Sequence, residues 1–382
     1  MDLKSTHREG LPSSIHRIVV KVGSRILVDE QGRPDPERIE QLAGEIADLH
    51  LQERYEVILV SSGAIAAGVQ TLGWSERPGH LPELQMAAAL GQGVLMNQYS
   101  NFFASHNCRI GQVLLTHADL RNRERHLNAR NTMLTMLRNG VIPVVNENDV
   151  VATDEIKFGD NDLLASMVAT LVDADLLILL TTADGFHRTE NGKLTERVSR
   201  LDGVSDEVLR MAGGKGSGWS TGGMASKLKS AEHAVRAGTP VVIANGTTRG
   251  MLSRILNGDD VGTLILNDQQ EQPLKARKKW IAFFHRPQGT IVVDKGAEKA
   301  IRHHGNSLLP VGVDHTRGEF PVGALVNIES MNGKVVARGI TSYSRKDVES
   351  IKGVHSAEIS SILGECHFEE VIHRDNMVLI DE

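Results

Sequence analysis

The chain has 382 residues, of which 40% are hydrophobic and 24% are charged, and its formal net charge at pH 7 is −6. Such a composition is ordinary for a soluble globular protein, and the length predicts two domains or three. The acidic balance argues against a general binder of nucleic acids or of membrane surfaces, because proteins of those classes are usually basic.

Buried strands alternate with amphipathic helices from about residue 16 to about residue 266. The first strand is expected at residues 17–22, and a helix then begins with Asp35 as its N-cap and Pro36 at its first position. Further strands are expected near residues 56–60, 110–116, 141–145, 176–180 and 239–244, and further helices near residues 82–105, 124–138, 161–170 and 223–237. Near-continuous apolar strands separated by helices predict an α/β fold, with an open, mainly parallel sheet sandwiched between helices.

The pattern changes after residue 266. Residues 267–286 are polar and predict a linker, whereas residues 287–382 contain short strands broken by glycines, which is typical of a small β-barrel with a C-terminal extension. From residue 276 to residue 382, 14 lysines and arginines balance 14 aspartates and glutamates. We therefore expect a first domain over residues 1–266 and a small, formally neutral second domain.

The cysteines and the N-terminal residues indicate the cellular compartment in which the protein is expected. Cys108 and Cys366 form no CxxC pair, so neither a disulfide framework nor a zinc site is supported. The N-terminal residues are polar and lack the apolar core of a signal peptide, and the longest apolar run, residues 176–180, is too short to span a bilayer. These features predict a cytoplasmic protein without a membrane segment.

An acidic segment, residues 144–165, follows one of the predicted strands. Its carboxylates are those of Glu147, Asp149, Asp154, Glu155, Asp160 and Asp162. The spacing does not fit an EF-hand, which needs a glycine at the sixth position and a glutamate at the twelfth. A solvated loop is one interpretation, since charge runs usually face water. The segment nevertheless lies beyond the carboxyl end of a strand, where open α/β sheets bind their ligands.

A glycine-rich segment, residues 213–227, is the strongest single indication of anion binding. Glycines allow the backbone to approach an anion closely, and helix N-termini bind phosphate, although neither the Walker pattern nor the Rossmann pattern can be drawn here. Lys227 lies just inside the helix that follows, and Lys21 ends the first strand, where an unpaired buried ammonium would be costly. The alternative interpretation of residues 213–227 is a flexible surface loop. The alternative for Lys21 is a side chain that extends its ammonium group to the solvent at the edge of the sheet.

Two lysines, glycine-rich loops and an acid–amide cluster at one edge of a parallel sheet predict phosphoryl transfer, in which catalysis is mostly positioning and charge neutralisation. The small residues 61–68, SSGAIAAG, join a strand to a helix and add a hydroxyl at the same edge. No candidate histidine base lies near these motifs. A carboxylate acceptor would explain its absence, because a carboxylate is already ionised at neutral pH.

Several segments together closely resemble the glutamate 5-kinases, a family with the amino-acid kinase fold and a C-terminal PUA domain. They are residues 19–24, 60–68, 114–132, 143–162 and 220–227, and the tail. The resemblance implies ATP-dependent phosphorylation of the γ-carboxylate of L-glutamate to L-glutamyl 5-phosphate, the first step of proline biosynthesis. It also implies Mg²⁺ with the ATP, feedback inhibition by proline at a site overlapping that of glutamate, and a homo-oligomer.

The same resemblance implies roles for individual residues. Lys21 and Lys227 contact the ATP phosphates, and Asp160 orients the two lysines. The glutamate-binding residues are Ser61, Asp149 and Asn161, with Asp149 facing the substrate ammonium. The further nucleotide contacts are Thr181, Thr182, Thr221, Gly222, Gly223, Met224, Ala225 and Ser226. Lys157 and Asp162 lie in the matching block without an assigned role, and no protein ligand is assigned to the metal.

The chain departs from the family at one place. The family usually has Thr-Asp at Thr181-Thr182, and GLY where residues 185–187 read GFH. This departure bears on the base or ribose of the nucleotide and leaves the phosphate chemistry unaffected. Two alternatives stay open: a kinase of the same fold acting on aspartate, an N-acetylated amino acid or carbamate, and RNA binding through the tail. The neutral charge of the tail weighs against RNA, because phosphate contacts need a cationic surface.

Overall fold

The computed structural model describes most of the chain in two parts. The described residues are 8, 11, 15–29, 31–52, 55–152, 161–190, 193–212, 223–267, 287–364 and 368–380. The chain divides into two compact units, residues 1–273 and 274–382, which are described separately below. The expected linker, residues 267–286, falls outside the described residues except for its first.

The first unit is built on an eight-stranded sheet with the order β3-β4-β2-β1-β5-β9-β10-β8. The strands are β1 (Arg17–Val22), β2 (Glu56–Val60), β3 (Arg109–Leu115), β4 (Val141–Glu147), β5 (Leu176–Thr181), β8 (Arg200–Asp202), β9 (Val241–Asn245) and β10 (Thr263–Leu266). All neighbours from β3 to β9 are parallel, and only the β9–β10 pair is antiparallel. The expected open, mainly parallel sheet is therefore confirmed. A separate two-stranded sheet pairs β6 (His187–Glu190) with β7 (Lys193–Arg197).

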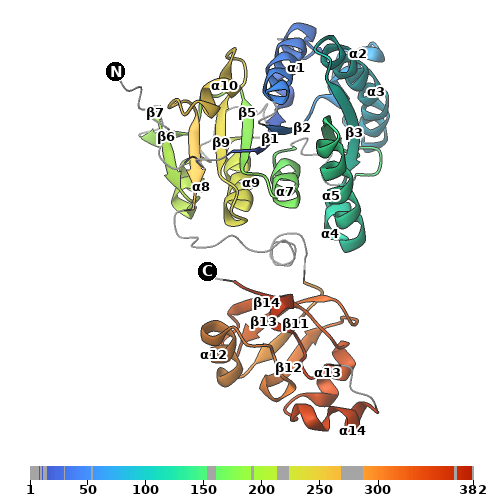
Figure 1. Ribbon diagram of the computed structural model, residues 1–382, viewed down its shortest axis with the longest axis vertical. Coiled ribbons are helices and arrows are strands. Elements are labelled where there is room, and N and C mark those ends of the chain that lie inside the picture. The colour runs from blue at the N-terminus through green and yellow to red at the C-terminus, as the bar shows by residue number, and fades with distance from the viewer. Residues whose placement is uncertain are drawn as a thin grey trace. The chain divides into compact units, whose positions relative to one another are not determined.

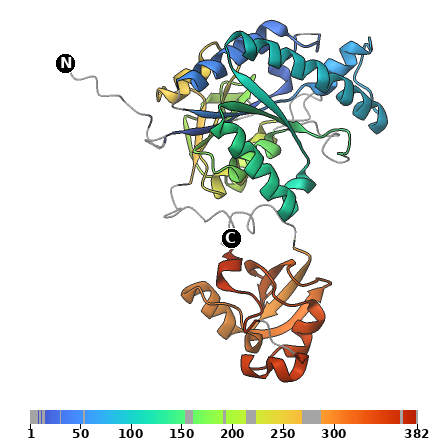
Figure 2. The same ribbon diagram turned by 45° about the vertical axis from the view of Figure 1, so that its right-hand side comes forward.

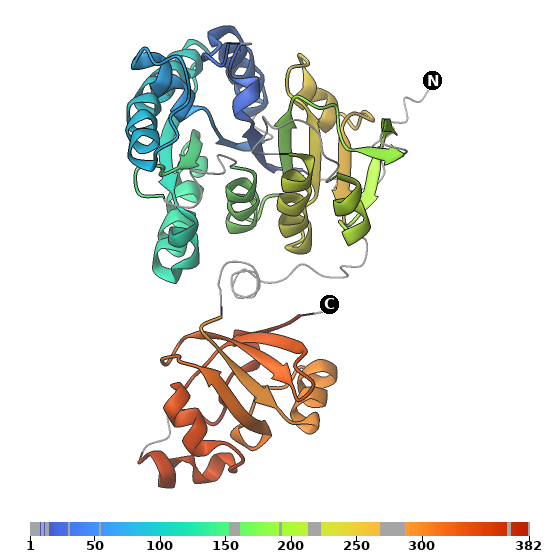
Figure 3. The ribbon, with the colours of Figure 1, turned by 180° about the vertical axis from the view of Figure 1, so that it is seen from behind.

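Helices cover both faces of this sheet (Figure 1). One layer holds α1 (Pro36–Leu51), α2 (Ala64–Thr71), α3 (Leu81–Ser105) and α10 (Met251–Leu256), and the other holds α4 (His117–Arg121), α5 (Arg123–Arg138), α7 (Asp162–Leu171) and α9 (Met224–Arg236). The short helix α8 (Asp206–Ala212) lies next to α9. The view from behind shows the same two layers (Figure 3).

Strand β1 shows how the sequence sets up the two faces. Successive side chains of a strand point to opposite sides, so Ile18, Val20 and Val22 join the core beneath α1, α3 and α10. Lys21 consequently points to the other side, toward α7 and α9. Because β1 is paired with β2 and β5 on its two edges, this lysine lies at the centre of the sheet.

The start of α1 follows from local sequence. Asp35 caps the helix, its side chain accepting a hydrogen bond from the amide of Arg38, and Pro36 occupies the first turn as expected. Ile39, Leu42 and Ile46 are buried on one face, at the spacing that indicated the helix.

The second unit contains a five-stranded mixed sheet with the order β12-β11-β13-β14-β15. Its strands are β11 (Gly289–Val293), β12 (Val313–Gly318), β13 (Leu325–Ser330), β14 (Val335–Ile340) and β15 (Met377–Leu379), and its helices are α12 (Lys295–His304), α13 (Arg345–Ile351) and α14 (Ile359–Leu363). A core of its own, including Ile291, Val326 and Val336, packs between these elements. The strand-rich character of the second unit was expected, whereas its three helices were not.

Within the described part of the chain, none of the helices combines the length and the apolar character that crossing a bilayer requires.

Candidate active site

Two lysines meet on one carboxylate at the carboxyl end of the central strand. Lys21 of β1 and Lys227 in the first turn of α9 both donate hydrogen bonds to Asp162, the first residue of α7. Lys21 contacts Oδ1, and the distance from Lys227 Nζ to Oδ2 is 2.9 Å. All three side chains are buried. Buried ammonium groups are stable only when paired, and these three groups sum to one positive charge, which suits them to hold an anion.

Asp162 is the main addition that the structure makes to the sequence analysis. Asp160, to which the resemblance gave the role of orienting the lysines, lies outside the described residues, as does Lys157. Asp162 was singled out without a role, and the structure places its carboxylate in contact with both ammonium groups. The cost of burying an unpaired ammonium at Lys21 was the signal in the sequence that such a partner must exist.

The structure describes part of the loops that were expected to bind the phosphates near this cluster. Helix α9 begins at Met224 with Gly223 as an extended N-cap, so Gly223, Met224, Ala225 and Ser226 form its N-terminal turn. Thr221 and Gly222 lie outside the described residues. On the other side, the amide of Gly23 donates to the carbonyl of Leu180 at 3.2 Å. This amide is therefore engaged within the fold.

An amide network adjoins the lysine cluster. Asn161 immediately precedes Asp162, and its Nδ2 donates to the carbonyl oxygen of Ser61 and to Oδ1 of Asn146, at 2.6 Å each. Asn146 in turn donates to Oε1 of Gln92 on α3 at 2.7 Å. The hydroxyl of Ser61 lies 2.9 Å from that of Tyr99, also on α3. Ser61 and Asn161 are therefore in contact, as the predicted substrate site requires, and α3 supplies two partners that no motif indicated.

Asp149 lies in the segment that follows β4, half-buried. Burial raises the pKa of its carboxyl to about 6, and the positive charge of Arg77 opposes that rise. A raised pKa means that the surrounding protein compensates this negative charge poorly. The segment is held to α3 by a hydrogen bond from Gln85 to the carbonyl of Ala152 at 3.1 Å. Asp149 therefore lies where an organic cation would be stabilised.

Thr181 and Thr182 follow the neighbouring strand. Thr181 ends β5 opposite Asn245 of β9, and its carbonyl accepts a hydrogen bond from Gly246. Thr182, at the position where the chain departs from the family, is exposed. At residues 185–187, where the chain also differs from the family, His187 forms a hydrogen bond with Asp184 at 2.7 Å. Hydrogen bonds to Thr195 and Asp184 raise the pKa of His187.

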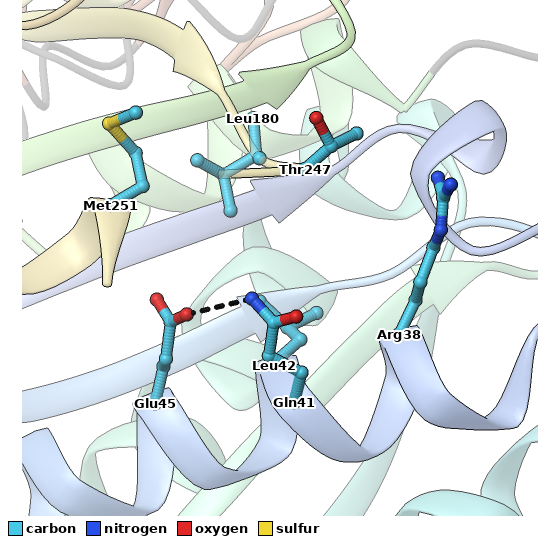
Figure 4. Close-up of a pocket in the computed structure, with 8 residues that line it drawn as sticks. Arg38, Gln41, Leu42, Glu45, Leu180, Thr247 and Met251 are labelled. Carbon is cyan, nitrogen blue, oxygen red and sulfur yellow. Dashed lines mark hydrogen bonds between the residues drawn. The ribbon is translucent and has the colours of Figure 1, made fainter. Parts of the chain in front are cut away.

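Two cavities lie away from the cluster of Lys21, Lys227 and Asp162. A cavity of about 20 Å³ lies on the opposite face of the sheet, between α1, Leu180 and Met251 (Figure 4). It has room for about one water molecule, and Glu45, which accepts hydrogen bonds from Gln41 and from the amide of Gly250, occupies one of its walls. The second unit has a pocket of about 630 Å³ beside α12. Its wall carries acidic and basic side chains together, Asp294 and Glu370 with His373 and Arg374.

Among the residues that the structure describes, there is no group of three or more histidines, cysteines, aspartates or glutamates that could hold a metal ion.

Comparison with known proteins identifies the family of this chain. Residues 16–245 match the model of the amino acid kinase family, and residues 289–363 match that of the PUA domain. A glutamate 5-kinase of Carboxydothermus hydrogenoformans is 46% identical over 96% of this chain and 98% of its own length. Glutamate 5-kinases of Citrifermentans bemidjiense and Moorella thermoacetica are 46% and 44% identical, covering 98% and 96% of this chain and 100% and 97% of their own. With both of its domains matched and its relatives aligned nearly end to end, the chain belongs to the amino acid kinase family and, within it, to the glutamate 5-kinases.

Proposed function

We propose that this protein transfers the γ-phosphoryl group of ATP to the γ-carboxylate of L-glutamate, giving L-glutamyl 5-phosphate and ADP, as the first step of proline biosynthesis. The observation that carries the proposal is the sharing of one buried carboxylate, Asp162, by Lys21 and Lys227. The names of the relatives supply the substrate: each of those reported above is a glutamate 5-kinase.

In this mechanism the chain positions two anions and neutralises charge. A γ-carboxylate oxygen of glutamate forms a bond to the γ-phosphorus while the bond from that phosphorus to the bridging oxygen of ADP breaks. Lys21 and Lys227 stabilise the charge on the equatorial and leaving oxygens, and Asp162 holds their ammonium groups in place. No general base is needed, because a carboxylic acid with a pKa of about 4.3 is ionised at neutral pH.

Nucleotide contacts extend from the lysines on two sides. Gly223 to Ser226 at the start of α9 would face the phosphates, since helix N-termini favour anions. Thr181 and Thr182 would lie nearer the ribose and base. We expect Thr221, Gly222 and Asp160 to contribute as the family resemblance implies. Mg²⁺ would accompany the ATP, since this ion commonly takes phosphate oxygens and water as ligands.

Glutamate would bind across the amide network. Asp149, whose charge the surrounding protein compensates poorly, would pair with the substrate ammonium. Arg77, whose charge already acts on Asp149, would contact the α-carboxylate. Ser61 and Asn161 would orient the γ-carboxylate toward the lysines, because Asn161 bonds Ser61 on one side and adjoins Asp162 on the other. Proline carries the same ammonium and α-carboxylate pair, so we expect it to inhibit by competing for Asp149. We further expect a cytoplasmic homo-oligomer.

A substrate panel tests the proposal. ADP release should be well above background with glutamate and several-fold to many-fold lower with aspartate, N-acetylglutamate or carbamate. The chain with Lys227→Met should lose the glutamate-dependent signal. Equal rates with glutamate and aspartate would refute the substrate assignment.

A further inference from the structure

The pocket of about 630 Å³ in the second unit is not used by the reaction proposed above. Its volume lies within the range of about 300–1,000 Å³ that is typical of small-molecule sites. Three segments form its wall: the start of α12, residues 306–312 and residues 370–374. Figure 1 and, after a turn of 45°, Figure 2 show α12 along one side of this unit. Several wall residues, among them Asp294 and Leu309, are exposed, so a ligand can enter the pocket from solvent.

Backbone hydrogen bonds hold the three segments of the wall together. The amide of Leu308 donates to the carbonyl of Ile372 at 2.8 Å, and the amide of Asp294 donates to the carbonyl of Gly312 at 3.1 Å. A Cβ added at Gly312 would lie 2.5 Å from the Cβ of Ala297, so a residue without a side chain lets this segment approach α12 closely. The wall is therefore formed before any ligand binds, which lowers the entropic cost of binding.

The wall offers two carboxylates to a cationic group. Oδ1 of Asp294 accepts a hydrogen bond from the amide of Ala297 at 2.7 Å, and the carboxylate has a second oxygen. Glu370 is half-buried, and its Oε1 lies 3.9 Å from Nε2 of His373. That distance is too long for a hydrogen bond. An ammonium group in the pocket would therefore find acceptors on both α12 and the 370–374 segment.

The same wall offers donors to a carboxylate. Among the described residues, none accepts a hydrogen bond from the guanidinium of Arg374. The hydroxyl oxygen of Ser307 accepts a hydrogen bond from the amide of Arg374 at 3.0 Å, so the hydroxyl can still donate its own proton. A guanidinium binds a carboxylate through two parallel hydrogen bonds. An organic acid is therefore a suitable partner for this part of the wall.

Apolar side chains complete the pocket. Leu309 and Val311 have exposed fractions of 42% and 43%, and both lie in the wall with Ala297 and Ala300 of α12. A concave surface that combines exposed apolar side chains with a few polar groups is typical of a ligand site. The apolar residues therefore provide a surface for an apolar part of the ligand.

We propose that this pocket binds a small zwitterion with an apolar side chain, which is the chemistry of an apolar amino acid or dipeptide. The carboxylates of Asp294 and Glu370 pair with its ammonium group, the guanidinium of Arg374 pairs with its carboxylate, and Leu309 and Val311 contact its side chain. Two acids and one arginine give the wall a formal charge of −1 when histidine is neutral, which disfavours a polyanion such as RNA. The inference does not depend on which amino acid the first unit phosphorylates.

Isothermal titration calorimetry of the full-length chain with leucyl-leucine and with leucine tests this proposal. Saturating glutamate and ADP are present, so that the site in the first unit is filled. We expect saturable binding of at least one of the two probes, and Glu370→Gln and Arg374→Ala should each weaken it by about fivefold or more. The matched controls are Glu369→Gln and Lys299→Ala, which change exposed residues outside the wall and should leave the affinity unchanged.

Modified forms of the bound probe assign each charged group to its partner. N-acetylation removes the ammonium group and amidation removes the carboxylate, and each should weaken binding to the wild type by about fivefold or more. The penalty for N-acetylation should largely disappear in Glu370→Gln, and the penalty for amidation in Arg374→Ala, because a contact that is already lost cannot be lost again. A variant that merely fails to fold cannot produce this crossed pattern. Glycylglycine, which carries both charges without an apolar side chain, should bind several-fold more weakly than leucyl-leucine.

Three results would overturn the proposal: no saturable binding of either probe, an affinity that Glu370→Gln and Arg374→Ala leave unchanged, or penalties that do not follow the crossed pattern. Binding of a short single-stranded RNA that Arg374→Ala abolishes, without binding of either zwitterion, would assign the pocket to nucleic acid instead. The substrate assignment would stand in each case, since the ADP-release panel tests it separately.

Discussion

Replacing Asp162 by asparagine tests the centre of the proposed mechanism. The substitution keeps the shape of the side chain and removes the negative charge that Lys21 and Lys227 share. The three-group cluster then changes from one net positive charge to two. All three residues are buried, so solvent compensates little for the loss.

The expected cost can be worked from this geometry. Two ammonium groups that bond opposite oxygens of one carboxylate lie about 5–6 Å apart, and at an effective dielectric constant of about 20 they repel by about 3 kcal/mol. The removal of one partner from a buried ion pair typically costs about 3–5 kcal/mol. We therefore expect Asp162→Asn to lower the free energy of unfolding by about 3 kcal/mol. We expect kcat to fall by about a hundredfold, as when a preorganised charge-stabilising group is lost.

Chemical denaturation and steady-state kinetics measure these two effects, and Asp173→Asn is the matched control. Asp173 follows the other end of α7 and pairs with Arg130 at 3.0 Å in a partly exposed setting, where such a pair contributes about 1 kcal/mol or less. Added ADP should restore more stability to Asp162→Asn than to the wild type, because the surplus positive charge favours an anion. A variant as stable and as active as the wild type would refute the reasoning.

Three further predictions concern the glutamate side of the site. The carboxyl of Asp149 takes up a proton as the pH falls through about 6. We therefore expect kcat/KM for glutamate to be full above that pH and to fall about tenfold per pH unit below it. The substitution Asp149→Asn should abolish this pH dependence. The substitution Arg77→Ala should raise the KM for glutamate and leave the KM for ATP unchanged. It should also reduce the preference for glutamate over 4-aminobutanoate, which lacks the α-carboxylate. The control variant is Glu76→Ala, on the same loop. Tyr99→Phe removes the hydroxyl that contacts Ser61 at 2.9 Å, and we expect about 1 kcal/mol of lost stability, measured by denaturation, with a smaller effect on ATP kinetics than on glutamate kinetics.

The sheet could be predicted because its strands are locally determined. Apolar runs such as residues 56–60 and 176–180 are long enough to be buried on both faces, and their alternation with helices leaves few arrangements other than a parallel sheet. The antiparallel strand β10 could not be predicted in the same way, since Thr263–Leu266 has the same apolar character and its direction depends on how the chain returns from α10.

The site was predictable to the extent that its residues belong to motifs. Lys21, Ser61 and Lys227 each adjoin a recognisable strand end or glycine-rich loop. Gln92 and Tyr99 lie within a long helix whose apolar and polar positions give no indication of a ligand. They reach the candidate site through hydrogen bonds to Asn146 of β4 and to Ser61, which follows β2. Contacts of that kind depend on tertiary packing, which no local pattern encodes.

The first turn of α7 explains how two reactants can be aligned by so few residues. Asn161 and Asp162 are consecutive, yet their side chains contact different groups: Asn161 bonds Ser61 and Asn146, whereas Asp162 bonds the two lysines. In the proposed mechanism, a single peptide unit, which is planar and rigid, would therefore link the acceptor side of the site to its phosphate side. Positioning of this kind contributes to catalysis only if it survives thermal motion. Here it is anchored by α7 itself, in which every residue from Leu164 to Leu171 is buried.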